Sequence, residues 1–268
     1  MNAEQAHVSV VIPCYKCRDT IERAILSVIQ QTLIPLQIIL VEDVSDDGTF
    51  EFLQEMKVKY GSLVEINVIV SEKNQGAGSA RNLGLKSAIG NYIAFLDADD
   101  SWHPFKIEIQ YSWMVKHPYV EVTGHDRLVV DDESYEPLII NKSAEVNKIS
   151  ANSMLFKTPF STPTVMMKNN AKYRFPPIRY AEDYGLWLDI VLSGGKCYKI
   201  DSPLALIYKA AYGSGGLSSH LLQMELGVQS AFKDVLKKSK ISLPMYLTVS
   251  LFSWLKFLRR LLLSKISK

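Results

Sequence analysis

The stretch Tyr92-Ile93-Ala94-Phe95-Leu96-Asp97-Ala98-Asp99-Asp100 joins an uninterrupted apolar run to three carboxylates. The β-forming residues from Tyr92 to Leu96 predict a buried strand of a parallel sheet. Carboxylates at the carboxyl end of such a strand stand at the rim where open α/β sheets bind ligands. They offer the hard oxygen atoms that Mg²⁺ or Mn²⁺ takes from a protein alongside the phosphates of a substrate. An acidic turn that caps a helix starting near residues 102–104 explains this stretch alone equally well.

Strands and helices alternate along the chain before this stretch. Apolar, β-branched runs at residues 8–12, 36–41 and 64–70 predict three strands, each followed by a helical segment. This order is typical of right-handed βαβ units around a largely parallel sheet. The turns at residues 42–49 and 74–82 are polar and contain glycine. Because the carboxyl ends of parallel strands meet at one edge, we expect Asp43, Arg81 and the acids from Asp97 onward to share one crevice.

Composition limits the kind of protein. The chain has 268 residues, of which 47% are hydrophobic, enough for a real core in one large domain or two small ones. A net charge of +2 argues against a general nucleic-acid-binding protein. The sequence begins without a secretory signal and has no run of eighteen apolar residues, so we expect a cytosolic body. Cys14 and Cys17 form a C-x-x-C pair that is expected to stay reduced, although a redox pair or half a zinc site has the same spacing.

The order of these motifs resembles that of the family 2 glycosyltransferases, which are inverting, nucleotide-sugar-dependent enzymes with the GT-A fold. The resemblance covers residues 8–220, and each matching segment lies at a predicted strand end or helix start. No single segment is specific, but five in the right order are. The matching segments are Val10-Val11-Ile12-Pro13-Cys14-Tyr15, Val41-Glu42-Asp43 with Asp47-Gly48-Thr49, Gly76 to Gly84 around Ala80-Arg81-Asn82, Asp97-Ala98-Asp99-Asp100, and Glu182-Asp183.

The resemblance implies a donor site for a nucleotide-sugar, with UDP as the expected nucleotide. It places Pro13 and Asp43 at the nucleobase, where Asp43 accepts a hydrogen bond from an imide N–H such as that of uracil. Tyr15 belongs to the same donor-binding set, and Arg81 is expected near the base and the phosphates. Each residue taken singly has a simpler structural interpretation. Arg81 would form an ion pair with a nearby acid, and Asp43 would cap a helix.

The resemblance also implies the metal and the catalytic base. Asp97 is expected to face the ribose or the metal, and Asp99 to bind the Mn²⁺ or Mg²⁺ that bridges the diphosphate. Asp183 is expected to take the proton from the attacking acceptor hydroxyl, with Glu182 as a less favoured substitute. Without the upstream motifs, two acids that favour a helix dipole explain Glu182 and Asp183 better.

The sequence departs from the family pattern at two turns. Lys16 stands where the family commonly has Asn, and Glu42 and Val44 replace the more usual Asp and Gly. Asp43 is retained, so these changes affect the expected shape of the base pocket and the nucleotide preference.

We predict a catalytic domain at residues 1–220, with a nucleotide-sugar half at 1–105 and an acceptor half at 106–220. Within the second half, residues 133–147 read as a surface loop and 161–167 as a strand. The segment 212–220 is rich in Gly and Ser, which fits a flap over the donor and a plain linker equally well.

Residues 221–268 are predicted to form a basic helical tail. Leu247, Leu251, Leu255, Leu258 and Leu262 recur at helical spacing, with Lys256 and Arg260 on the other side. This pattern is typical of a helix lying on an anionic membrane surface. Such attachment fits an enzyme that works at the cytoplasmic face of the inner membrane on a lipid-linked saccharide, as relatives in lipopolysaccharide, O-antigen or capsule synthesis do. A helix that docks on the domain or forms a homodimer is the alternative.

Two other functions share some of these sequence features. A sugar nucleotidyltransferase needs a glycine-rich, basic phosphate loop after the first strand, and residues 13–17 contain no glycine. A non-catalytic membrane module that binds nucleotide-sugars or glycans keeps Asp43 and the metal ligands but tolerates loss of Asp183.

Overall fold

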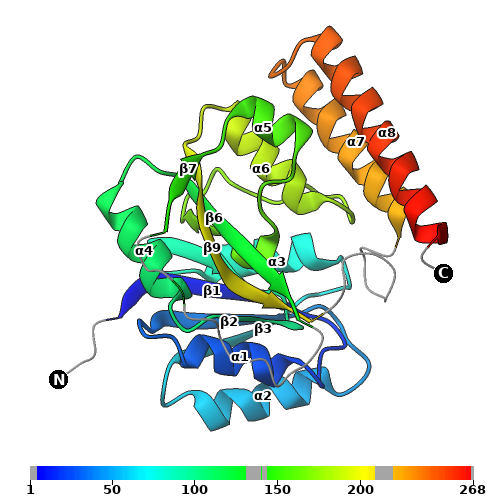
Figure 1. The fold of residues 1–268 in the computed structure, drawn as a ribbon. Coiled ribbons are helices and arrows are strands. Elements are labelled where there is room, and N and C mark those ends of the chain that lie inside the picture. The colour runs from blue at the N-terminus through cyan, green and yellow to red at the C-terminus, as the bar shows by residue number, and fades with distance from the viewer. Residues whose placement is uncertain (1–4, 131–139, 141–143, 209–219, 267–268) are drawn as a thin grey trace.

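One mixed sheet organises the protein (Figure 1). The computed structural model describes residues 5–130, 140, 144–208 and 220–266. Within these ranges nine strands form the sheet, in the order β3-β2-β1-β4-β8-β6-β9-β5, and β7 pairs with β9. The strands, in chain order, are β1 (Ala6–Cys14), β2 (Pro35–Glu42), β3 (Glu65–Val70), β4 (Tyr92–Phe95), β5 (Asp100–Trp102), β6 (Val122–Val129), β7 (Val146–Lys148), β8 (Met166–Lys168) and β9 (Cys197–Ile207).

Helices connect the strands and cover both faces of the sheet (Figure 1). Residues along β1 alternate between the two cores: Val10 and Ile12 pack with α1, α2 and α4, whereas Val11 packs with α3 and α6. The strand is therefore apolar on both faces, as its continuous apolar run predicts. The helices are α1 (Ile21–Ile29), α2 (Thr49–Tyr60), α3 (Ala77–Ser87), α4 (Lys106–Lys116), α5 (Ala151–Phe156), α6 (Glu182–Leu192), α7 (Leu221–Lys237) and α8 (Leu243–Ile266), together with a short 3₁₀ helix, η1 (Thr162–Thr164).

The predicted α/β fold is confirmed, and the part of the sheet built by the first four strands is entirely parallel. Strands β1, β2, β3 and β4 pair in parallel. Beyond β4 the sheet is mixed, since β8 pairs antiparallel with both β4 and β6. The strand order places β1 between β2 and β4, so chain connections diverge on either side of β1. This is the topological switch point at which open α/β sheets bind ligands.

Two details differ from the sequence-based predictions. Residues 161–167 do not form one strand, because Pro163 lies in η1 and the strand begins only at Met166. The predicted loop at 133–147 ends in β7, which pairs with β9. Within the segment 212–220, interpreted as a flap or a linker, residues 212–219 lie outside the described residues. His220 occupies the N-cap position of α7 and makes no side-chain capping hydrogen bond. Cys14, Cys17 and Cys197 are buried free cysteines.

The carboxyl-terminal helices form a hairpin that docks on the domain (Figure 1). Helix α7 packs on α6, and α8 packs on α7 and α5, with Val249 and Phe257 buried. The leucine stripe of α8 faces outward instead: Leu251, Leu255 and Leu258 are 63%, 56% and 52% exposed. Within the described ranges, none of the helices combines the length and apolar composition that crossing a membrane requires.

Candidate active site

All seven residues that the sequence assigns to the site line one cavity of about 960 Å³. It opens at the carboxyl ends of β1, β2 and β4, where these parallel strands meet. Segments that are far apart in the chain thus converge as expected from the sheet topology. The seven are Pro13, Tyr15, Asp43, Arg81, Asp97, Asp99 and Asp183.

Asp43 is held at the floor of this cavity by the loop before α3. Its two carboxylate oxygens accept hydrogen bonds from the backbone N–H groups of Gln75, at 3.2 Å, and Gly76, at 2.8 Å. Asn74 donates its side-chain amide to the Asp43 carbonyl at 2.9 Å. The side chain is therefore fixed in a loop-capping role, yet a carboxylate has about four acceptor positions. Two remain for a ligand donor that enters the cavity.

Strained backbone marks the turns around the cavity. Lys16, Val44 and Ala181 have φ values of 48°, 59° and 56°, a left-handed region in which a non-glycine residue costs about 1–2 kcal/mol. The turn after β2 is held by Glu42, whose carboxylate accepts from the N–H groups of Val44 and Ser45. Lys16 and Val44 are the positions where the family commonly has Asn and Gly, which tolerate this conformation best. At Lys16 and Val44 the departures from the family pattern thus place non-glycine side chains in a left-handed backbone conformation.

Arg81 joins two parts of the site. Its guanidinium donates to Asp97 Oδ1 at 2.7 Å and to Glu182 Oε1 at 2.9 Å, and the side chain is 5% exposed. The ion-pair reading of Arg81 therefore describes its contacts, although it also lines the cavity. Burial raises the pKa of Glu182 to about 7, against the opposing charge of Arg81. Glu182 is an interior partner of Arg81, which leaves Asp183 as the acid of this pair with a side chain open to both cavities described here.

The acids after β4 form a charged rim with strong mutual repulsion. Burial, reinforced by the charges of Asp97 and Asp99, raises the pKa of Asp100 to about 9. Arg23 donates to the Asp99 carbonyl at 2.7 Å, which fixes the turn. Among the residues that the structure describes, no three His, Cys, Asp or Glu side chains are grouped as a complete metal site. Two adjacent carboxylates on one cavity fit Mg²⁺ or Mn²⁺, which completes its shell with substrate phosphates and water.

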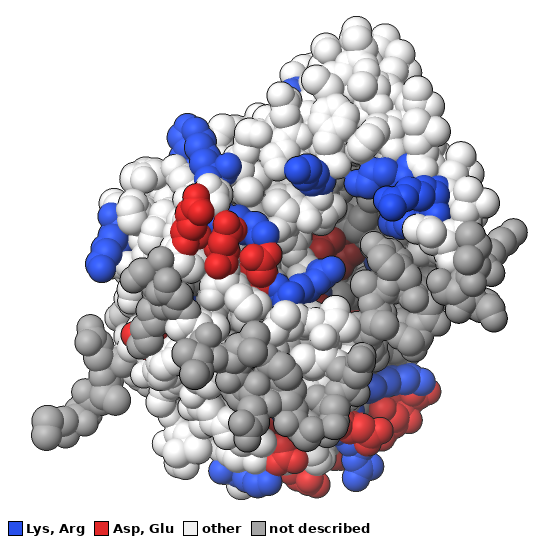
Figure 2. Space-filling model, in the orientation of Figure 1, with Lys and Arg blue, Asp and Glu red and all other residues white. Residues whose placement is uncertain are grey.

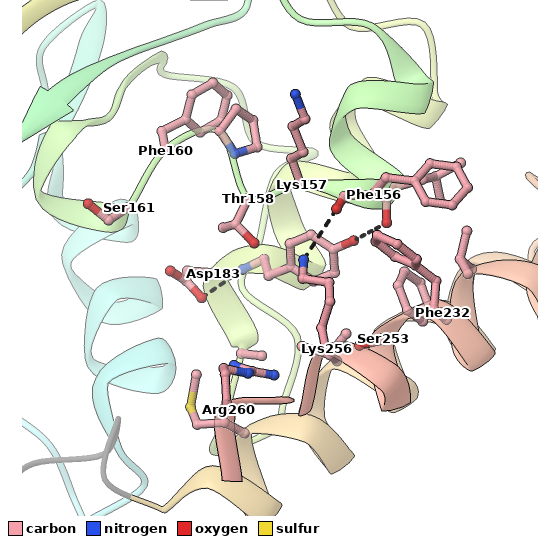
Figure 3. Close-up of a pocket in the computed structure, with 18 of the residues that line it drawn as sticks. Phe156, Lys157, Thr158, Phe160, Ser161, Asp183, Phe232, Ser253, Lys256 and Arg260 are labelled. Atoms are coloured by element: carbon pink, nitrogen blue, oxygen red, sulfur yellow. Dashed lines mark hydrogen bonds between the residues drawn. The ribbon is translucent and has the colours of Figure 1, made fainter. Parts of the chain in front are cut away.

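Asp183 stands at the amino terminus of α6, between two cavities. Its Oδ2 accepts from Thr162 Oγ1 at 2.9 Å, and its Oδ1 accepts from the Tyr184 N–H at 2.7 Å. It lines the donor-side cavity and also a second cavity of about 720 Å³, which lies between α6 and the α7–α8 hairpin (Figure 3). Thr162 is not identifiable from the sequence, because the pattern of residues 161–167 predicts a strand where the structure has η1.

The mixed α/β sheet, with a polar cavity at the ends of its parallel strands, is the architecture of the GT-A fold. The chain matches the family model described as "Glycosyl transferase family 2" over residues 9–176. It therefore belongs to glycosyltransferase family 2, as the motifs predicted, and is a transferase.

Curated relatives agree with this assignment. One is TuaG of Bacillus subtilis (strain 168), whose name assigns it to teichuronic acid biosynthesis as a glycosyltransferase; it is 33% identical over 74% of this chain and 77% of its own. Another is the Escherichia coli "UDP-Glc:alpha-D-GlcNAc-diphosphoundecaprenol beta-1,3-glucosyltransferase WfgD", 33% identical over 69% of each chain.

Solved structures share the fold at low identity. The Pyrobaculum calidifontis mannosyltransferase PcManGT, solved with GDP-Man and Mn²⁺, superimposes with a TM-score of 0.68 and 18% identity, over 92% of this chain and 70% of its own. Staphylococcus aureus TarS 1–349 with UDP-GlcNAc gives a TM-score of 0.67 and 20% identity, over 85% of this chain and 66% of its own. Against the longer TarS chain the match spans 39% of that chain.

Proposed function

We propose that this protein is a metal-dependent, inverting glycosyltransferase. It transfers a sugar from a nucleotide-sugar, with UDP as the favoured nucleotide, to a hydroxyl of a lipid-linked saccharide in bacterial surface glycan synthesis. One observation carries the proposal: Asp183 borders both the cavity that holds the other six predicted site residues and a second cavity large enough for an acceptor sugar. The names of TuaG and WfgD, with a surface polymer and a diphosphate-linked lipid acceptor, support the substrate class.

On this proposal the donor lies across the ends of β1, β2 and β4. Asp43 accepts from the imide N–H of the base, while Pro13 and Tyr15 border the ring. Arg81 is a positioning residue, because its two terminal nitrogens pair with Asp97 and Glu182. These ion pairs hold the start of α6 against the floor of the cavity. A shift of this ion pair would move Asp183, the neighbour of Glu182.

Asp97 and Asp99 would hold the divalent ion. When bound, it neutralises charge that develops on the departing diphosphate. Asp183 acts from the opposite side, taking the proton of the acceptor hydroxyl as that oxygen attacks the anomeric carbon. Thr162 and the Tyr184 N–H orient the carboxylate, because each occupies one of its oxygens in a fixed direction.

A thermal-shift series tests the donor site. A ligand that binds the folded state raises the melting temperature by mass action, so UDP with Mn²⁺ should raise it more than UDP with EDTA. Asp99→Asn should abolish the Mn²⁺-dependent part. Asp234→Asn, which changes a half-exposed acid on α7, is the matched control and should behave as the natural protein does. An Asp99→Asn protein with the full Mn²⁺-dependent shift would rule out this ligand assignment.

We further propose that the exposed leucine stripe of α8 rests on an anionic bilayer at the cytoplasmic face of the inner membrane. An apolar stripe beside the exposed Arg259 is the pattern of an interfacial helix. The full chain should float with vesicles containing phosphatidylglycerol, and the triple variant Leu251→Ser, Leu255→Ser, Leu258→Ser should not. The leucine stripe would instead be a homodimer interface if the natural protein is dimeric by light scattering, the triple variant is monomeric, and neither protein floats with the vesicles.

A further inference from the structure

The second cavity carries an excess of positive charge. Five basic and two acidic side chains line it, and one of those acids, Asp126, is already paired with Lys199 at 2.5 Å. In Figure 2, basic side chains gather around the hollow at the base of the α7–α8 hairpin. A cavity with unbalanced cations lowers its electrostatic energy by taking an anion. The basic residues are Arg127, Lys157, Lys199, Lys256 and Arg260.

Two of these cations come from α8, one helical turn apart. Lys256 and Arg260 extend into the cavity that Asp183 borders from α6 (Figure 3). Lys256 Nζ donates to the Phe156 carbonyl at 3.3 Å and forms no ion pair with any described residue. Arg260 donates to Glu225 at 3.3 Å, and this fully buried carboxylate balances only one of the two charges. Burial and the charge of Arg260 lower the pKa of Lys256, which is the direction expected of a cation beside a second positive charge.

We infer that Lys256 and Arg260 bind the diphosphate of a lipid-linked acceptor and thereby place its sugar beside Asp183. The inference rests on the proposed function and names the acceptor subsite of the same enzyme. Side chains at i and i+4 lie on one helix face about 5–6 Å apart, a spacing that suits two linked phosphates. Arg recognises phosphate oxygens through paired N–H groups, and Lys contributes a point charge.

The surroundings favour a diphosphate carried by a hydrocarbon chain over a sugar carboxylate. A single carboxylate would need one cation, whereas two converge here. On the same helix, Phe252 lines the cavity and Leu251 and Leu255 continue the apolar surface outside it. The amphipathic pattern of α8 thus offers cations to the anionic linker and an apolar route to the chain that follows it.

Titration calorimetry on the full chain, saturated with UDP and Mn²⁺, tests this subsite independently of turnover. The probe is N-acetylglucosamine linked through a diphosphate to a ten-carbon prenyl chain. Two further ligands carry the same chain, one as a neutral glycoside of N-acetylglucosamine and one as a glycoside of glucuronic acid. The short chain keeps all three in solution, so membrane binding does not contribute.

Lys256→Gln should weaken binding of the diphosphate probe at least roughly tenfold, the usual weight of a hydrogen bond to a charged group. Arg260→Gln removes the counter-charge of the buried Glu225 carboxylate, to which Gln229 still donates at 2.7 Å. It is therefore combined with Glu225→Gln, and the paired variant should show a similar loss. Neither change should alter binding of the neutral glycoside. Arg259→Gln, an exposed cation of the same helix that does not line the cavity, is the matched control and should bind the probe normally.

Unchanged probe affinity in Lys256→Gln and in the paired variant would overturn the subsite. Equal affinity of the natural protein for the diphosphate and neutral ligands would also overturn it. An equal dependence of the glucuronic acid ligand on Lys256 would replace the diphosphate by a carboxylate. Failure of the proposed function has a different signature, because the probe would still bind but no ligand would be glycosylated with any nucleotide-sugar.

Discussion

Replacing Asp183 with Asn separates the chemistry of this carboxylate from its structural contacts. Oδ1 can still accept from the Tyr184 N–H, as it does at 2.7 Å. In the natural protein Thr162 Oγ1 donates to Asp183 Oδ2 at 2.9 Å. In the variant the new amide nitrogen would take the place of Oδ2 and donate to the Thr162 hydroxyl, which can accept a hydrogen bond as well as donate one. Asn is nearly isosteric with Asp, so both contacts survive and only basicity is lost.

These contacts set the expected magnitudes. With both hydrogen bonds kept, the free energy of unfolding should change by less than about 1 kcal/mol, since one net hydrogen bond contributes about that much. The rate of transfer should fall by about 10²–10⁴, the usual contribution of a positioned general base. That loss corresponds to roughly 3–5 kcal/mol in the activation barrier. Stability and turnover should therefore separate clearly in this variant.

The assay measures release of UDP in single-turnover and steady-state modes, with donor affinity measured by calorimetry. Asp183→Asn should bind UDP with Mn²⁺ as the natural protein does, and kcat should carry the loss. Asp234→Asn again serves as the control for the loss of one surface charge. Turnover within a few fold of the natural protein would remove Asp183 from the role of base. A matching loss of donor affinity would show that the residue acts by shaping the donor cavity.

Three other changes test packing and electrostatics. Burial raises the pKa of Glu182 from 4.5 to about 7, so the folded protein holds this proton more tightly than the unfolded chain does and stability should fall as pH rises from about 4.5 to 7. Glu182→Gln should remove this part of the slope, at most roughly 3 kcal/mol, in urea titrations across that pH range. In Gly227→Ala the new Cβ would clash with the Tyr180 carbonyl oxygen, so α7 must shift. Limited proteolysis of the α7–α8 hairpin should therefore be faster in this variant. Ser230→Ala, at an exposed position of the same helix, should leave the proteolysis rate unchanged. Val44→Gly should raise the melting temperature. Relief of the left-handed backbone strain, about 1–2 kcal/mol, exceeds the cost of the extra conformational entropy that glycine adds to the unfolded chain. A lower melting temperature in this variant would contradict the strain argument.

The donor side of the site was predictable because its position follows from local signals. Apolar runs that end in polar, glycine-containing turns mark the carboxyl ends of β1, β2 and β4. The sense of the βαβ connections then brings these ends to one edge. Asp43 and Asp97 could therefore be placed together from spacing and topology alone, without knowledge of any side-chain contact.

The partners of these residues were not predictable, because they depend on contacts between distant segments. Arg81 and Glu182 are 101 positions apart, and no pattern in either segment specifies the other. Thr162 reaches Asp183 only because Pro163 turns the chain into η1 where an alternating pattern had indicated a strand. Side-chain pairing across such separations is decided by packing, which composition and periodicity do not encode.

Helix α8 shows how a correct periodicity can leave the orientation of a helix open. A helical wheel separates its leucines from Lys256 and Arg260, and in a globular protein the apolar side of such a helix normally faces the core. Here Val249 and Phe257 make the buried contacts, while Leu251 and Leu255 are more than half exposed, and Lys256 and Arg260 line the second cavity. In the isolated protein the exposed leucines stay in water, and the second cavity carries more basic than acidic side chains. A bilayer against the leucines and a diphosphate between the cations would relieve both at once. A single amphipathic acceptor, with an anionic linker joining its sugar to its lipid, therefore accounts for both faces of α8.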